Sequence, residues 1–144
     1  MDFQKEIVSQ EISRTGVRTI LVATDFTEYS DMALQEAIDI ALQQNARIYL
    51  LHVERLTEKR TVDSPEILIR TQIGKFAEVN MVEIIPAIRK GSPYEEILKE
   101  QAEKGIDLIV IGSHGKKGLR HHLTEDVATK IAKKVPCSIL LIGA

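Results

Sequence analysis

Short apolar runs alternate with segments of helical periodicity along most of this chain, and this alternation constrains the fold more than any other feature. Runs of this length are typical of strands covered on both faces, and a helix between two strands makes them parallel. The sequence therefore predicts an α/β fold, a doubly wound, five-stranded parallel sheet in the order 3-2-1-4-5 with helices on both faces. The expected strands are Thr19–Thr24, Arg47–Val53, Asn80–Ile85, Ile106–Ile111 and Ser138–Ile142.

Polar residues and prolines mark the expected ends of these elements. Ser30 is placed to cap the first helix, and Asn45 ends it. A looser helical pattern spans residues 65–78. Pro86 either closes the third strand or restricts it to a sheet edge. Residues Ser92–Glu95 read Ser-Pro-Tyr-Glu, which predicts a capping box with proline at the first helical position.

The residues before the first apolar run differ in character from the rest of the chain. They are polar with scattered apolar positions, so we interpret residues 1–17 as an N-terminal arm that is mobile or serves as a docking segment. Residues 18–144 then form one domain with a single core. The single Cys137 has no partner for an internal disulfide, and its apolar neighbours indicate a buried thiol.

Composition narrows the classes of function. Lys and Arg number 19 against 21 Asp and Glu, and Trp is absent, so neither a basic surface nor stacking platforms for general nucleic-acid binding are expected. No apolar run approaches the roughly 20 residues that span a bilayer. The first ten residues lack the apolar core of a signal peptide. We therefore expect a cytoplasmic protein with no membrane partner.

A glycine-rich loop follows the fourth expected strand, where Gly112, Gly115 and Gly118 are spaced three apart. Glycines let backbone amides approach an anion, and the next helix start adds partial positive charge. The spacing matches neither a Walker loop nor the dinucleotide fingerprint, so phosphate binding and a plain tight turn are equally open. In a parallel sheet this loop meets Asp25 and Val53 beyond the strand ends, where ligands bind. Asp25 is equally well explained as a turn-forming aspartate.

Three segments of the chain read LVATDFTEYSDMALQEAIDIA, KGSPYEEIL and DLIVIGSHGKKGLRHHLTEDVATKIAKKVPCSILLI. They resemble the universal stress protein family, and the resemblance covers about residues 18–144. It implies an adenine-nucleotide site in which Asp25 lies near the ribose or a metal and Val53 offers backbone groups to the adenine. ATP binders of the family share the motif G-x2-G-x9-G-(S/T). The resemblance also implies a homodimer in which Ser138–Ile142 pairs with its copy across a two-fold axis.

The chain departs from this motif at one place. Gly112 and Gly115 match the first two glycines, but Glu125 and Asp126 stand where the family has glycine and then serine or threonine. Val127 continues the match without a gap. A carboxylate about 4 Å from a phosphate charge costs on the order of 1 kcal/mol in water and about 4 in a partly screened site. For both carboxylates even the low figure sums to roughly 2 kcal/mol, more than tenfold in affinity.

Two interpretations of the site follow. In the favoured one, Glu125 and Asp126 fill the anion position at the helix start themselves. The protein is then a non-catalytic stress-response or regulatory homodimer with weak or absent ATP binding and an unidentified protein partner. In the alternative, Mg²⁺ or the basic loop residues offset the repulsion, and the protein is an ATP-binding switch with slow hydrolysis. A metal enzyme built on His114, His121 or His122 is a more distant hypothesis, because adjacent histidines on a helix point apart.

Overall fold

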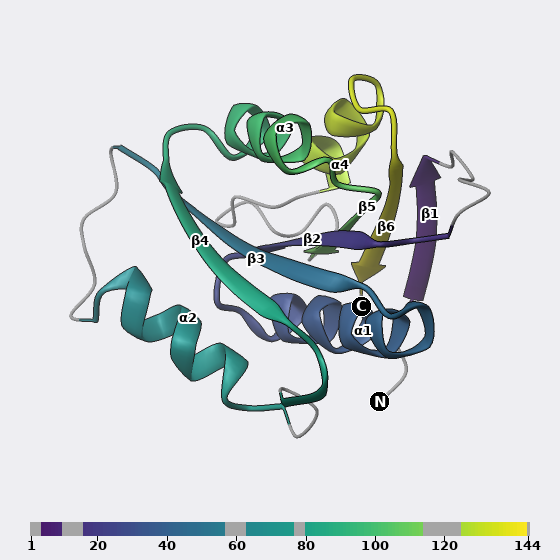
Figure 1. Cartoon of the computed structure of the whole chain (residues 1–144). Coiled ribbons are helices and arrows are strands. Elements are labelled where there is room, and N and C mark those ends of the chain that lie inside the picture. The colour runs from purple at the N-terminus through teal and green to yellow at the C-terminus, as the bar shows by residue number, and fades with distance from the viewer. Residues whose placement is uncertain (1–3, 10–15, 57–62, 77–79, 114–124, 144) are drawn as a thin grey trace.

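The computed structural model describes residues 4–9, 16–56, 63–76, 80–113 and 125–143. In these ranges six strands form one sheet in the order β1-β6-β5-β2-β3-β4 (Figure 1). Strands β2 to β6 are parallel, which confirms the five-stranded doubly wound sheet and its predicted order 3-2-1-4-5. The strands are β1 (Gln4–Ser9), β2 (Thr19–Thr24), β3 (Arg47–Glu54), β4 (Ile84–Lys90), β5 (Leu108–Ser113) and β6 (Ser138–Gly143).

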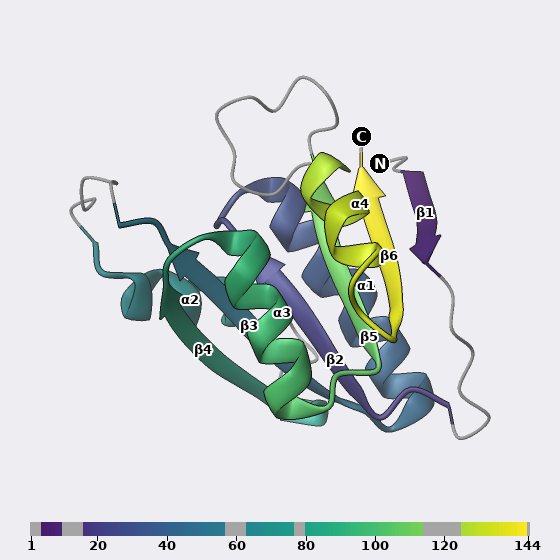
Figure 2. The same ribbon diagram turned by 90° about the horizontal axis from the view of Figure 1, so that it is seen from above.

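Helices cover both faces of the sheet, as predicted. Successive side chains of β2 point to opposite faces. Ile20 packs in one core cluster with Leu34 of α1, whereas Leu21 packs in a second cluster with Ile97 of α3. Figure 2 views the sheet from the side that α3 and α4 cover. None of the helices in the described ranges is long and apolar enough to cross a bilayer. The helices are α1 (Glu28–Gln44), α2 (Pro65–Ile73), α3 (Pro93–Lys104) and α4 (Glu125–Ala132).

The N-cap of the first helix lies three residues before the predicted cap, Ser30. Thr27 is the N-cap of α1, and its side chain accepts a hydrogen bond from the backbone N–H of Ser30. The prediction that Ser30 caps the helix is therefore wrong, because Ser30 lies fully buried in the first turn. Asn45 ends the helix in the left-handed conformation (φ 56°), which confirms the predicted end.

The bounds of the third parallel strand and of the helix before it differ from the predicted bounds. The observed strand β4 includes Pro86 rather than ending before it. It tolerates proline because it lies at the sheet edge and pairs only with β3, so a missing N–H on its outer side removes no ladder bond. The second helix ends at Ile73, short of residue 78. Pro93 is the first residue of α3, as predicted, but the Ser92 side chain makes no cap hydrogen bond, so the capping box is not formed.

The opposite edge of the sheet is formed by the N-terminal segment. Strand β1 pairs antiparallel with β6, with Lys5 opposite Ile142 and Ile7 opposite Leu140, and the register shifts between Ile7 and Ser9. In the predicted order 3-2-1-4-5 the strand Ser138–Ile142 is the last of the sheet and its outer edge is open. This expectation is wrong, because β1 lies along that edge. The local sequence pattern did not predict β1, because this edge strand depends on its pairing with β6, which lies more than a hundred residues away in the chain.

Candidate functional site

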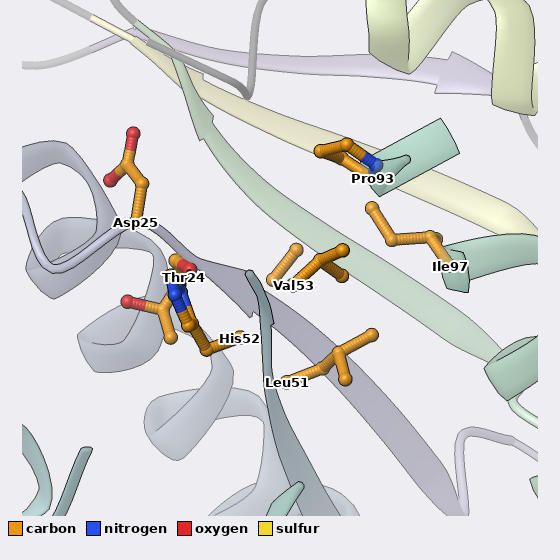
Figure 3. A pocket seen from close by; sticks show the side chains of 8 residues that line it. Thr24, Asp25, Leu51, His52, Val53, Pro93 and Ile97 are labelled. Atoms are coloured by element: carbon orange, nitrogen blue, oxygen red, sulfur yellow. Dashed lines mark hydrogen bonds between the residues drawn. The ribbon is translucent and has the colours of Figure 1, made fainter. Parts of the chain in front are cut away.

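A small pocket opens beyond the carboxyl ends of β2 and β3, beside the start of α3 (Figure 3). Its cavity volume is about 10 Å³, room for about one water molecule. The pocket brings together Asp25 and Val53, two of the residues predicted for the site, since both lie where parallel strands end. The residues that line it are Ala23, Thr24, Asp25, Leu51, His52, Val53, Pro93 and Ile97.

The carboxylate of Asp25 is held by the first turn of α1. Its Oδ1 accepts hydrogen bonds from Ser30 Oγ at 2.6 Å, from Thr27 Oγ1 at 2.5 Å and from the Thr27 backbone N–H at 3.2 Å. The bond from the backbone of the residue two positions on is the turn that aspartate commonly forms. The negative charge also lies at the positive end of the helix dipole. Asp25 therefore has the turn-forming role, and it is also one of the residues that line the pocket.

Phe26, the next residue, adopts a left-handed backbone conformation (φ 64°). A positive φ is strained for a bulky residue and is found mostly at functional sites and tight turns. The Phe26 ring packs on the His52 ring with centroids 4.4 Å apart. His52 is buried, and its Nδ1 donates to the carbonyl oxygen of Thr24 at 2.9 Å. These contacts fix the chain on both sides of Asp25. His52 was not predicted as a residue of the site, because nothing in the sequence distinguishes a histidine within an apolar run.

A buried polar network joins the end of β2 to both α1 and α2. Thr24 Oγ1 donates to Gln72 Oε1 at 2.8 Å, and Gln72 Nε2 donates to Asp31 Oδ1 at 2.9 Å. Lys75 Nζ completes the network at 3.0 Å from Asp31 Oδ2. Gln72 is only 2% exposed, so its two hydrogen bonds, to Thr24 and Asp31, replace water that the amide cannot reach. The network fixes α2 to the strand that carries Asp25.

The first glycine of the predicted phosphate motif has a clear packing role. A Cβ on Gly112 would lie 2.0 Å from the carbonyl oxygen of Tyr29 and 2.9 Å from the backbone nitrogen of Ser30. The start of α1 thus passes so close to β5 that only glycine fits. Gly115 lies outside the described residues. Glu125 and Asp126 are the first two residues of α4, and Val127 packs against the core beneath α3 and α4.

The replacement Gly112→Ala is expected to lower the free energy of unfolding by about 1–3 kcal/mol, as overpacking typically does. The matched control is Gly74→Ala, whose new methyl would lie at an ordinary 3.5 Å from the nearest atom, the carbonyl oxygen of Arg70. This control is expected to change stability by less than about 1 kcal/mol. Urea denaturation followed by circular dichroism measures both. Similar losses for the two variants would contradict the packing role of Gly112.

Arg89 of β4 holds α3 in place over the sheet. Its Nη2 lies 2.9 Å from Glu100 Oε1, its Nη1 lies 3.4 Å from Glu96 Oε1, and it also contacts Glu103. Burial alone would lower the pKa of Arg89, but the hydrogen bonds and charges of Glu100 and Glu103 outweigh this effect and raise it. Arg89 therefore stays charged at every working pH. We call these contacts of Arg89 with Glu96, Glu100 and Glu103 the clamp on α3. They fix α3, and the first turn of this helix contains Pro93, which lines the pocket.

The buried face of α3 includes charged residues. Ile97 is fully buried, whereas Ala102 is exposed and Leu98 is only partly buried. Glu96 and Glu100 take their place, at 8% and 2% exposed. Charged residues at helical spacing suggest a solvent face. Their burial is possible because Arg89 pairs with both acids and Lys99 Nζ also lies 3.1 Å from Glu96 Oε2.

The histidines of the metal hypothesis, His114, His121 and His122, lie outside the described residues. Among the residues that the structure does describe, no group of three or more His, Cys, Asp or Glu side chains is arranged to hold a metal ion. Cys137 is buried, as predicted.

The parallel sheet with helices on both of its faces defines a doubly wound α/β domain, and its pocket lies near the ends of the central strands, where such domains usually have their sites. The model of the universal stress protein family matches residues 16–143, and the chain belongs to this family. The family predicted from the three sequence segments is thereby confirmed.

Individual relatives agree with this assignment. The universal stress protein YxiE of Bacillus subtilis is 29% identical over 143 residues, which cover 85% of this chain and 97% of the relative. A universal stress protein solved in complex with cAMP aligns with a TM-score of 0.67 at 19% identity, over 89% of this chain and 98% of its own. A family member from Arabidopsis thaliana with AMP bound aligns with a TM-score of 0.59 at 21% identity, over 88% and 91% of the two chains. At these identities the two structures establish the fold.

Proposed function

We propose that this protein is a non-catalytic, regulatory universal stress protein of the cytoplasm that binds ATP weakly or not at all. The observation that carries the proposal is the pair Glu125 and Asp126 at the start of α4. ATP binders of the family have glycine followed by serine or threonine there. The glycine lets the backbone approach a phosphate, and the hydroxyl donates to it, so this chain replaces two favourable contacts by two negative charges.

The position of the two acids in the helix makes their effect specific for phosphate. The N-terminus of a helix carries a partial positive charge that attracts anions. In this chain the first two residues of α4 are acids, and acids in the first turn of a helix complement that charge. A triphosphate brought to the same place meets repulsion of roughly 2 kcal/mol or more. The ATP affinity is accordingly lowered at least tenfold.

At the other end of the site, the residues around the pocket support the proposal by their chemistry, although an adenosine moiety requires the pocket to open beyond its present room for one water molecule. Asp25 is fixed at the pocket, and Val53, Pro93 and Ile97 offer an apolar lining. The structural neighbours described above bind AMP and cAMP, which carry a single phosphate group each. A ligand with one phosphate places less negative charge near α4 than ATP does. The adenine nucleotide that fits this protein best is therefore a monophosphate.

Isothermal titration calorimetry of the purified protein with AMP and with Mg-ATP tests this proposal. AMP is expected to bind at least tenfold more tightly than Mg-ATP, because only the longer phosphate chain must extend to the two acids. A titration with MgCl₂ alone serves as the control for metal binding. Micromolar affinity for Mg-ATP would contradict the proposal and favour the alternative, an ATP-binding switch with slow hydrolysis.

Self-association is also part of the proposed function. A homodimer through Ser138–Ile142, with an unidentified protein as the regulated partner, follows from the family resemblance. This dimer needs the outer edge of β6, and β1 lies along that edge.

A further inference from the structure

The strand β1 lies outside the part of the chain that the family model matches, which is residues 16–143. Figure 2 shows β1 beside β6 at the border of the sheet, running in the opposite direction. Antiparallel pairing joins Gln4 to Gly143 at one end and Ser9 to Ile139 at the other.

The two borders of the parallel sheet are protected in different ways. Strand β4 contains Pro86, Arg89 and Lys90, and prolines and charges are the usual means by which an edge strand avoids pairing with another chain. Strand β6 reads SILLIG and contains no charged residue. Without a cover it would be a template for another strand. Strand β1 reads QKEIVS, so the strand that becomes outermost has two charges among its six residues.

The direction of β1 along β6 is the direction in which the β6 strand of a second copy would lie. Two copies related by a two-fold axis pair the same strand of each copy in antiparallel fashion. Strand β1 is also antiparallel to β6, so it occupies the backbone groups that the β6 strand of a second copy would need. One edge can pair with only one strand at a time. We propose that β1 is an intramolecular edge cap that competes with a second copy of this chain for β6, so that the protein dimerises only when β1 is released.

Chain length and concentration favour the intramolecular pairing. Nine residues join Ser9 to Thr19, and an extended chain of that length spans about 30 Å. Strands β1 and β2 are separated by three inter-strand steps, about 14 Å in all, so the connection is long enough. A short linker gives an effective concentration in the millimolar range. A second copy at micromolar concentration is at a disadvantage of about a thousandfold, and β1 must leave before that copy can pair.

A disulfide between β1 and β6 tests whether the pairing lies within one chain. In a Cys137→Ala background, Ile7→Cys with Leu140→Cys joins residues that are direct partners across the two strands. Such partners have Cα atoms about 4.5–5.5 Å apart, within the range that a disulfide bridges. The control pair, Lys5→Cys with Leu140→Cys, is offset by two positions. Oxidation is expected to give a crosslinked monomer on a non-reducing gel for the first pair only. A covalent dimer, or no crosslink, would overturn the proposal.

Two consecutive prolines test the competition itself. In an antiparallel strand, one of any two neighbouring N–H groups faces the partner, so Glu6→Pro with Ile7→Pro removes that bond in either register. Sedimentation velocity at micromolar concentration is expected to show a monomeric wild type and at least a tenfold rise in the dimer-to-monomer ratio for the variant. Asp2→Pro, outside β1, should leave the wild-type ratio unchanged. A folded variant that stays monomeric, or a variant that loses its circular dichroism signal, would overturn the role of β1 as a detachable cap.

Discussion

Replacing Arg89 by methionine is expected to lower the free energy of unfolding by about 3–5 kcal/mol, the usual effect of breaking a buried ion pair by removing one partner. Glu100 is 2% exposed, and among the described residues its Oε2 already lacks a hydrogen-bond partner. Without the guanidinium, a carboxylate would stay buried with no charge to offset it. Urea denaturation followed by circular dichroism measures the loss.

Two further variants separate this effect from a general loss of an arginine. Arg47→Met removes an ion pair with Glu83 in which both side chains are more than half exposed, and exposed pairs contribute about 0–1 kcal/mol. Adding Glu100→Gln to Arg89→Met removes the buried charge and is expected to recover much of the lost stability. A loss for Arg89→Met no larger than that of Arg47→Met would mean that the clamp on α3 is unimportant.

The second large effect concerns ligand binding. Replacing Glu125 by glycine and Asp126 by serine restores the family motif and is expected to raise the affinity for Mg-ATP more than tenfold. Removing two like charges recovers roughly 2 kcal/mol by the lower estimate, and more if the site is partly screened from water. The affinity for AMP should rise less, because its single phosphate is closer to the adenosine end. Calorimetry on wild type and variant measures how much the affinity for Mg-ATP and the affinity for AMP each change.

A neutral pair of similar size shows whether charge is the cause. Glu125→Gln with Asp126→Asn removes the charges without adding a glycine or a hydroxyl group, so most of the gain should appear here too. It also controls for the loss of about 1 kcal/mol that a glycine causes in a helix. If neither double variant binds Mg-ATP more tightly than wild type, charge repulsion is not the reason for weak binding.

The sequence was most informative about the parallel core. Continuous apolar runs and helical periodicity are local signals, and they predicted the five parallel strands and their order. The bounds of β4 were wrong because Pro86 was allowed to end the strand, whereas its cost depends on whether the strand lies at an edge. Strand β1 was missed as an element because its pairing with β6 depends on contacts between the two ends of the chain.

The site was predictable only where topology determines it. Asp25 and Val53 follow strands, so the parallel sheet brings them to one pocket. The reason for Gly112 was not predictable, because the close approach of Tyr29 is a property of how α1 crosses β5. Glu100 was missed for a similar reason: a carboxylate in a helix suggests exposure until the arginine on another strand is known.

The most direct measurement is a crystal structure of the protein grown with a saturating concentration of Mg-ATP. The proposed function predicts an empty site, or a nucleotide whose adenosine lies at Asp25 and Val53 with its terminal phosphates turned away from the start of α4. A triphosphate seated against Glu125 and Asp126, with no cation between them, would contradict it.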